Sequence, residues 1–97
     1  MRIISKKRIY EFFESQPGAE DSVLRWYQIC KQANWSSLAD LKQDIGTVDY
    51  VENGLYVFNI GGNKYRLIAR IIFRAKVIYI RFVGTHKEYD SVNFSTL

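Results

Sequence analysis

Hydrophobic and polar residues alternate with two different periods along the chain. In the first half, apolar residues recur at spacings of three and four, which predicts helices over residues 6–15, 19–33 and 37–45. Pro17-Gly18 breaks the first helical pattern, and Gly46 ends the third. A short strand is predicted at Arg2-Ile3-Ile4, ahead of these helices.

The second half follows the period of two that is typical of strands, interrupted by tight-turn sequences. Strands are predicted at residues 47–51, 55–60, 63–73 and 76–85, and turns at Asn53-Gly54, Gly61-Gly62 and Arg74-Ala75. The tail, residues 86–97, is expected to begin with one helical turn. The sequence therefore predicts a single α+β domain, residues 1–97, in which a short N-terminal strand and the helices pack on one face of a C-terminal antiparallel sheet.

The strand predicted at residues 63–73 has one apolar and one cationic face. The apolar face, expected to meet the helices, carries Tyr65, Leu67, Ala69, Ile71 and Phe73. The opposite face carries Lys64, Arg66, Ile68, Arg70, Ile72 and Arg74. A pairing register that keeps these faces apart is favoured, because a slip of one residue would bury charges.

The turn at Arg74-Ala75 gives such a register. It pairs Ile71 with Ile78, Arg70 with Tyr79, Ala69 with Ile80, Ile68 with Arg81, Leu67 with Phe82, Arg66 with Val83 and Lys64 with Thr85. A two-residue turn at Gly61-Gly62 pairs Phe58 with Tyr65 and places Asn59 beside Lys64. The predicted outer face then carries Asn59, Lys64, Arg66, Arg70, Tyr79, Arg81 and Thr85, and His86, the single histidine, lies just past its end.

The net charge of +4 lies in the second half, where residues 51–97 hold 7 Lys and Arg against 3 Asp and Glu. Such a balance permits binding to nucleic acid or to an acidic protein. Solvated strand faces also carry Lys and Arg because these residues block aggregation. The coincidence of the cationic face with His86 at its edge favours a phosphate-binding surface.

This set of side chains suits the cleavage of RNA without a metal. The reaction needs a base for the 2′-hydroxyl, cations for the charge on phosphorus, and an acid for the leaving 5′-oxygen. His86 and Tyr89 are the candidate proton-transfer groups, Lys64 and Arg66 are the phosphate clamps, and Asp90 is a group that orients His86 or a basic neighbour. The alternatives remain a structural histidine, a tyrosine that packs on the sheet and an aspartate that caps a turn.

Other site types find little support in the chain. The single cysteine, Cys30, lies on the apolar stripe of a predicted helix and is expected to be a buried, inert thiol. Trp26 and Trp35 are expected in the core. No metal site and no cofactor are predicted. Neither a membrane-spanning run nor a signal peptide is recognised, so the expected location is the cytoplasm, without a membrane partner.

Two segments carry a resemblance to a known family. They are Phe58-Asn59-Ile60 with Gly62-Asn63-Lys64-Tyr65-Arg66-Leu67, and Phe82-Val83-Gly84-Thr85-His86-Lys87-Glu88-Tyr89-Asp90. With Trp26, Ala33-Asn34-Trp35 and Ser37, they resemble the HigB family of bacterial toxins, within the RelE-like superfamily of toxin–antitoxin modules. The resemblance covers roughly residues 2–92.

The resemblance implies a RelE-like fold and an mRNA interferase, an endoribonuclease that cuts translated messages, usually at the ribosome. It also implies a HigA-like antitoxin with a helix-turn-helix domain, so that operator DNA is bound only through the antitoxin complex. By position, Arg66 fits the arginine of the Tyr-Arg-Leu strand motif and Lys64 a cation of the family motif. His86 stands where RelE itself has an arginine, and Tyr89 lies near that protein's C-terminal tyrosine.

Two departures from the family pattern bear on the site. Histidine in place of arginine leaves open which group is the acid and which the base. Relatives often carry a basic residue where this chain has Gly61, which shifts substrate binding towards Lys64 and Lys87. The residues expected to bind RNA are Asn59, Asn63, Arg70, Arg81, Lys87 and Asp90. The competing functions are a ParE-like gyrase poison and a non-catalytic module that binds RNA or protein on the same fold.

Overall fold

The computed structural model describes residues 1–97 and confirms a helical first half and a strand-rich second half. Helices α1, α2 and α3 span Lys7–Ser15, Glu20–Gln32 and Leu38–Asp44, with a 3-10 turn at Pro17–Ala19 between the first two. Strands β1 to β5 span Arg2–Ile4, Asp49–Glu52, Leu55–Ile60, Tyr65–Ile72 and Val77–Thr85. The one-turn helix α4 (His86–Tyr89) follows β5 and confirms the predicted helical turn. A 3-10 turn at Phe94–Thr96 comes after it.

Local sequence explains where the helices begin. Ser37 is the N-cap of α3, and its Oγ accepts a hydrogen bond from the backbone N–H of Asp40 at 3.3 Å. Glu20 and Asp21 lie in the first turn of α2, where carboxylates interact favourably with the helix dipole. None of the helices has the length and apolar character that crossing a membrane requires.

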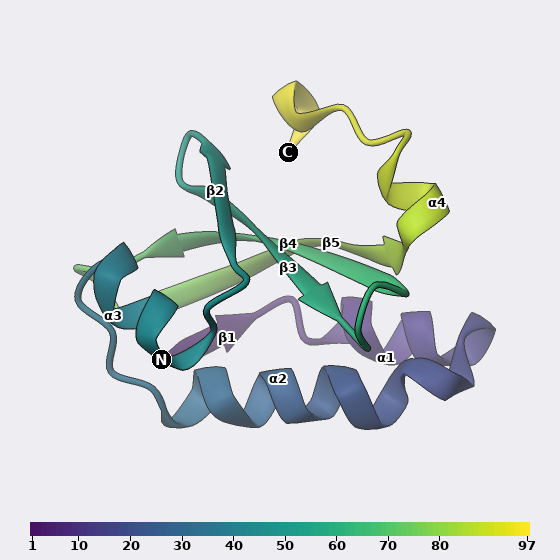
Figure 1. The fold of residues 1–97 in the computed structure, drawn as a ribbon, viewed down its shortest axis with the longest axis horizontal. Coiled ribbons are helices and arrows are strands. Elements are labelled where there is room, and N and C mark those ends of the chain that lie inside the picture. The colour runs from purple at the N-terminus through teal and green to yellow at the C-terminus, as the bar shows by residue number, and fades with distance from the viewer.

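The five strands form one sheet in the order β1-β5-β4-β3-β2. Strands β2 to β5 are antiparallel, but β1 pairs parallel to β5, with Ile3 opposite Ile78. The predicted antiparallel arrangement of the C-terminal strands is confirmed. The prediction that the N-terminal strand packs on one face of the sheet was wrong, because β1 joins its edge and makes the sheet mixed. Helices separate β1 from the next strand in the chain, so no tight turn fixes the direction of β1 relative to its neighbour in the sheet. β1 can therefore lie at the edge beside β5 in the parallel direction. Figure 1 shows α1 and α2 beneath the sheet, with α4 and the C-terminal segment on the opposite side.

The main core lies between the helices and the inner face of the sheet. Leu67 and Ala69 of β4 are fully buried there and Ile71 is 4% exposed, as the alternation predicted. Trp26 packs edge-to-face on Phe58 with 5.3 Å between ring centroids. The prediction that both tryptophans belong to the core is confirmed, with Trp26 5% and Trp35 3% exposed.

The hairpin between β3 and β4 is longer than expected. Ile60 pairs with Tyr65, and Phe58 with Leu67, so residues 61–64 form the loop and the predicted two-residue turn was wrong. Gly61 and Gly62 both have positive φ, a conformation that glycine adopts without strain. The register differs by two residues, which leaves every side chain on its predicted face but places Asn59 opposite Arg66 rather than Lys64.

Strand β5 contains a bulge that the alternating pattern did not predict. Ala69 pairs with Ile80, whereas Ile68 pairs with Phe82, so Arg81 is the extra residue. The predicted pairs up to this point are confirmed. Beyond it the predicted pairs were wrong, and they are instead Leu67 with Val83, Arg66 with Gly84 and Tyr65 with Thr85.

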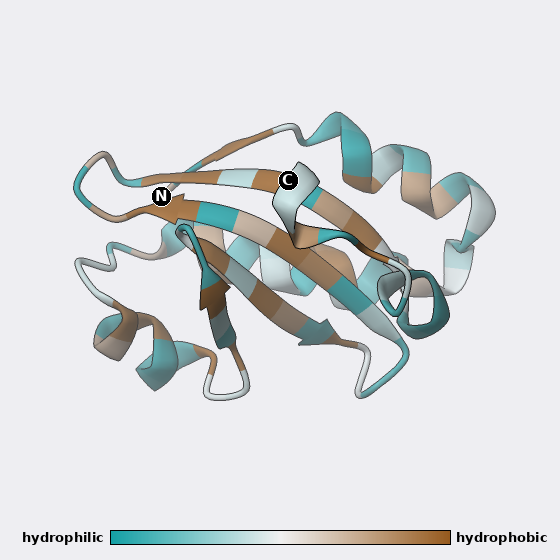
Figure 2. Cartoon of the chain, turned by 90° about the horizontal axis from the view of Figure 1, so that it is seen from above, coloured by the Kyte–Doolittle hydropathy of each residue, from teal (hydrophilic) through white to brown (hydrophobic).

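A second, smaller apolar cluster occupies the outer face of the sheet. Leu55, Val57 and Ile68 are at most 4% exposed. The bulge turns Phe82 towards this cluster, and the other covering side chains come from the C-terminal segment: Tyr89, Val92, Phe94 and Leu97. Figure 2 shows this segment crossing above the strands. The prediction of an open cationic outer face was therefore wrong for its centre, because the apolar residues there bind the tail.

Candidate active site

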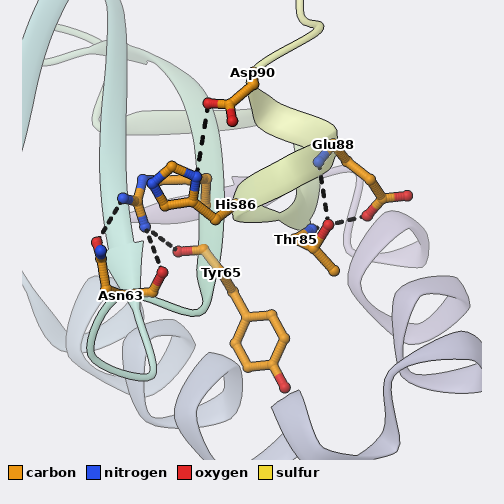
Figure 3. A network of polar contacts seen from close by, with 7 residues as sticks. Asn63, Tyr65, Thr85, His86, Glu88 and Asp90 are labelled. Atoms are coloured by element: carbon orange, nitrogen blue, oxygen red, sulfur yellow. Dashed lines mark hydrogen bonds and ion pairs between the residues drawn. The ribbon is translucent and has the colours of Figure 1, made fainter.

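The start of α4 is fixed beside the hairpin loop by two kinds of hydrogen bond. Thr85 Oγ1 accepts from the backbone N–H of Glu88 at 3.1 Å, and Glu88 Oε1 accepts from that of Thr85 at 2.8 Å, a capping box. The backbone N–H of His86 donates to the carbonyl oxygen of Lys64 at 2.9 Å. The predicted meeting of the residues around Lys64 with those around His86 is thus confirmed (Figure 3).

Arg66 is the one charged residue that the fold buries, at 7% exposed. Its Nη2 donates to Asn63 Oδ1 at 2.6 Å, and its Nη1 donates to the carbonyl oxygens of Asn63 at 3.4 Å and Tyr65 at 3.1 Å. No carboxylate forms an ion pair with it. Neutral oxygens therefore orient the guanidinium while its positive charge stays uncompensated, which suits the binding of an anion.

His86 lies on the exposed side of α4, one turn before Asp90. The distance from His86 Nδ1 to Asp90 Oδ1 is 3.6 Å, and the two side chains are 45% and 63% exposed. This is an electrostatic contact rather than a short hydrogen bond. The carboxylate lies beside Nδ1 of the imidazole, whose Nε2 has no hydrogen-bond partner within the protein.

Tyr89 is half-buried between the site and the second apolar cluster. Its ring centroid lies 5.8 Å from Arg66 Cζ, within the range of a cation–π contact. The ring therefore packs against the sheet, which was one of the alternatives that the sequence left open. It also contacts the buried guanidinium of Arg66. The two readings of Tyr89 are compatible in this geometry.

The remaining predicted residues divide into two groups. Lys64, Lys87, Asn59 and Asn63 are exposed near the hairpin loop and α4, and Asn63 also holds Arg66. Arg70 lies about 13 Å along β4 from Arg66, where its guanidinium donates to the carbonyl oxygens of Asn53 and Leu97. Arg81 is the bulged residue of β5. The structure does not bring Arg70 and Arg81 to His86.

Comparison with known proteins assigns the family. The family model of the HigB toxins, described as the RelE-like toxic component of a toxin–antitoxin system, matches residues 19–92. The chain belongs to this family. A protein of Escherichia coli K12 named mRNA interferase toxin HigB is 31% identical over 93 residues, which cover 93% of this chain and 88% of the relative. A Shigella flexneri protein named mRNA interferase HigB has the same identity and coverage.

The Escherichia coli O6:H1 protein named mRNA interferase HigB is 29% identical over 94 residues, covering 95% of this chain and 91% of the relative. The matched regions therefore contain the hairpin loop, β4, β5 and α4 together. For this HigB family member, the sequence similarity extends over every element that builds the candidate site.

A groove of about 480 Å³ lies beside the site of this HigB family member rather than in it. It runs between α2, the segment after α3 and the hairpin, and its lining includes Arg25, Trp26, Asn59 and Gly61. Neither Arg66, His86 nor Tyr89 lines it. The candidate site thus lies outside this groove, where the hairpin loop meets α4.

Sequence reasoning missed the supporting residues of the HigB family site. The spacing of Thr85 and Glu88 fits the capping-box signature and was available in the sequence. The hold of Asn63 on Arg66 depends on the longer hairpin loop and had no local signal. Cys30 is fully buried, and the loss of water around it raises the pKa of its thiol far above the ordinary value, in agreement with an inert role.

Proposed function

We propose that this chain is an mRNA interferase, an endoribonuclease that cuts translated messages in the cytoplasm without a metal. The observation that carries the proposal is Arg66, a buried cation oriented by neutral oxygens and free of any carboxylate. A cation fixed in this way is preorganised for a phosphodiester. The names of the relatives support the same activity.

The proposed reaction transfers the phosphorus between two oxygens of the RNA. A base removes the proton of the 2′-hydroxyl, the 2′-oxygen bonds to phosphorus, and the bond from phosphorus to the 5′-oxygen breaks. An acid gives a proton to that leaving oxygen, so the products are a 2′,3′-cyclic phosphate and a 5′-hydroxyl. His86 and Tyr89 share the two proton transfers, with the division between them open.

The charges are assigned by position. Arg66 and Lys64 stabilise the extra negative charge on the phosphate oxygens, and Arg66 offers the planar, two-point contact that suits such oxygens. Asp90 orients His86 across one turn of α4. The RNA strand on either side of the cut is bound by Asn59, Asn63 and Lys87, and farther along the sheet by Arg70 and Arg81.

Membership of the family implies an antitoxin partner. We propose that this partner is a HigA-like protein with a helix-turn-helix domain, and that operator DNA is bound only through their complex. The proposed arrangement of helices and strands is that of a RelE-like toxin. In this proposal the ribosome presents the message to the surface around His86.

Induced expression in a bacterium, with primer extension on a translated message, tests the proposal. Wild-type protein is expected to give discrete cuts that vanish in the His86→Ala and Arg66→Ala variants. Arg74→Ala is the matched control, because Arg74 is an exposed cation in the β4–β5 turn, away from α4.

The other outcomes contradict the proposal in different ways. Growth arrest with intact messages indicates a gyrase poison. Neither arrest nor cuts indicates a binding module, in which Arg66→Ala weakens RNA binding while His86→Ala leaves it unchanged. Cuts that persist in both site variants refute the site assignment.

A further inference from the structure

We infer that Phe94 is a positioning residue, which holds the ring of Tyr89 against the guanidinium of Arg66. The inference rests on the proposed function, since it concerns the same site. The rings of Tyr89 and Phe94 pack edge-to-face, with centroids 6.0 Å apart and planes at 81°. The Tyr89 ring also contacts Arg66, with 5.8 Å to Cζ. One aromatic ring therefore links the buried cation to the C-terminal segment.

Helix α4 cannot fix Tyr89 by itself. It has four residues, and a helix of one turn is unstable in isolation because nucleation is unfavourable. Its capping box secures the end at Thr85, whereas Tyr89 is the last residue, at the opposite end. The position of Tyr89 therefore depends on what its ring touches.

Phe94 has anchors that do not involve α4. Its side chain packs on the outer cluster of Leu55, Val57 and Ile68. The turn that carries it is closed by Asn93 Oδ1, which accepts from the backbone N–H of Ser95 at 3.0 Å. Just beyond, Arg70 Nη2 donates to the carbonyl oxygen of Leu97 at 3.3 Å. Phe94 is thus fixed to the sheet on its own account and can hold Tyr89.

A purely structural role predicts something different. Val92 and Leu97 cover the same cluster, but neither forms an aromatic contact with Tyr89. If Phe94 only excluded water, truncation of Leu97 would affect cleavage as much as truncation of Phe94. If Phe94 acts through Tyr89, its effect must disappear once Tyr89 is absent.

The kinetic test uses the full chain and a translated message on purified ribosomes. Phe94→Ala is expected to lower kcat about tenfold with KM within about twofold, because misplaced groups slow the chemistry more than binding. Phe94→Tyr restores the rate, since it keeps the ring, and Leu97→Ala changes kcat by less than about twofold. In a Tyr89→Ala background, Phe94→Ala is expected to have no further effect.

Equal losses in Phe94→Ala and Leu97→Ala overturn the inference, as does an undiminished Phe94→Ala effect in the Tyr89→Ala background. Wild-type kcat in Tyr89→Ala removes both this inference and the proposed role of Tyr89. Hydrogen exchange at the amides of α4 gives a readout without activity. Faster exchange in Phe94→Ala but not in Leu97→Ala supports the inference even if the wild type cuts no RNA, and unchanged exchange refutes it.

Discussion

The two faces of the sheet are covered by unlike means. On the inner face, α1 and α2 help to close a core of 18 buried residues, all of them apolar or aromatic. On the outer face, a short segment after β5 covers three buried apolar residues, and the nearby Arg66 is buried with its charge uncompensated. The inner face therefore carries the stability of the fold, and the outer face tolerates a cost in stability that serves binding.

The two faces differ in composition because the elements that cover them exclude water from areas of different width. Two amphipathic helices remove water from a wide area, so only apolar residues fit beneath them. The C-terminal segment is narrow and leaves polar groups at its margin. The His86 side chain is 45% exposed there, and Arg66 lies beside it at 7% exposed.

Leu67→Ala tests the inner face and is expected to have the largest effect. Leu67 is fully buried in the main core, and such a truncation costs about 2–5 kcal/mol of the free energy of unfolding. Leu55→Ala on the outer face, where the side chain is 1% exposed, is expected to cost less, because the smaller cluster can collapse. Urea denaturation compares the two, and equal costs would contradict the assignment of stability to the inner face.

Arg66→Ala tests the outer face and is expected to have a large effect on cleavage and a small effect on stability. Cleavage falls by about 100-fold or more, as for other preorganised groups that stabilise a transition state. The free energy of unfolding changes less than in Leu67→Ala. Single-turnover cleavage and urea denaturation measure the two quantities on the same samples. A large loss in the free energy of unfolding with little loss of cleavage would indicate that Arg66 has a structural role.

Asn63→Ala sharpens the comparison by leaving the charge and removing one of its supports. Loss of the 2.6 Å hydrogen bond to Arg66 Nη2 is expected to lower the cleavage rate about tenfold. Asn34→Ala, on an exposed residue of the helical half, is the control and keeps the wild-type rate. A wild-type rate in Asn63→Ala would show that the backbone carbonyl oxygens of residues 63 and 65 suffice to orient Arg66.

Ionisation of Cys30 is expected to have the smallest effect on stability. It tests whether water is excluded from the inner core around the thiol. In the unfolded chain its thiol ionises near the ordinary pKa of 9.0, whereas burial raises the pKa in the folded protein. The unfolded state therefore binds fewer protons above that pH, and stability falls as pH rises. About 1 kcal/mol is expected to be lost between roughly pH 8 and 9.5. Urea midpoints measured against pH show a smaller fall in Cys30→Ala, and parallel curves would refute this origin.

The sequence was a good guide to faces and a poor guide to register. The bounds of β3, the N-cap Ser37 and the helical turn at His86 follow from local chemistry and were predicted. A period of two tells which side chains share a face but not which residues pair. The hairpin loop and the bulge at Arg81 were therefore missed. The parallel pairing of β1 was missed for the same reason.

The candidate site was predicted in part for related reasons. The hydrogen bond between His86 and Lys64 brings together two segments that the strand order alone placed side by side. The guanidinium of Arg66 contacts the Tyr89 ring, and its hold by Asn63 depends on the longer hairpin loop; the alternation of residue types reveals neither. Phe94 carries no motif, and only its contact with Tyr89 singles it out.

The single extra residue at Arg81 has a consequence for how the protein tolerates changes of length. Arg81 is the one residue in this stretch of β5 that has no partner in β4, so its removal would leave Ile80 opposite Ala69 and Phe82 opposite Ile68 in a regular ladder. Side chains alternate along a strand, so Phe82 would stay on the outer face and Val83 on the inner face. A one-codon deletion at Arg81 is therefore expected to be tolerated, whereas a deletion in β4, which has no extra residue, would exchange the faces of the residues that follow.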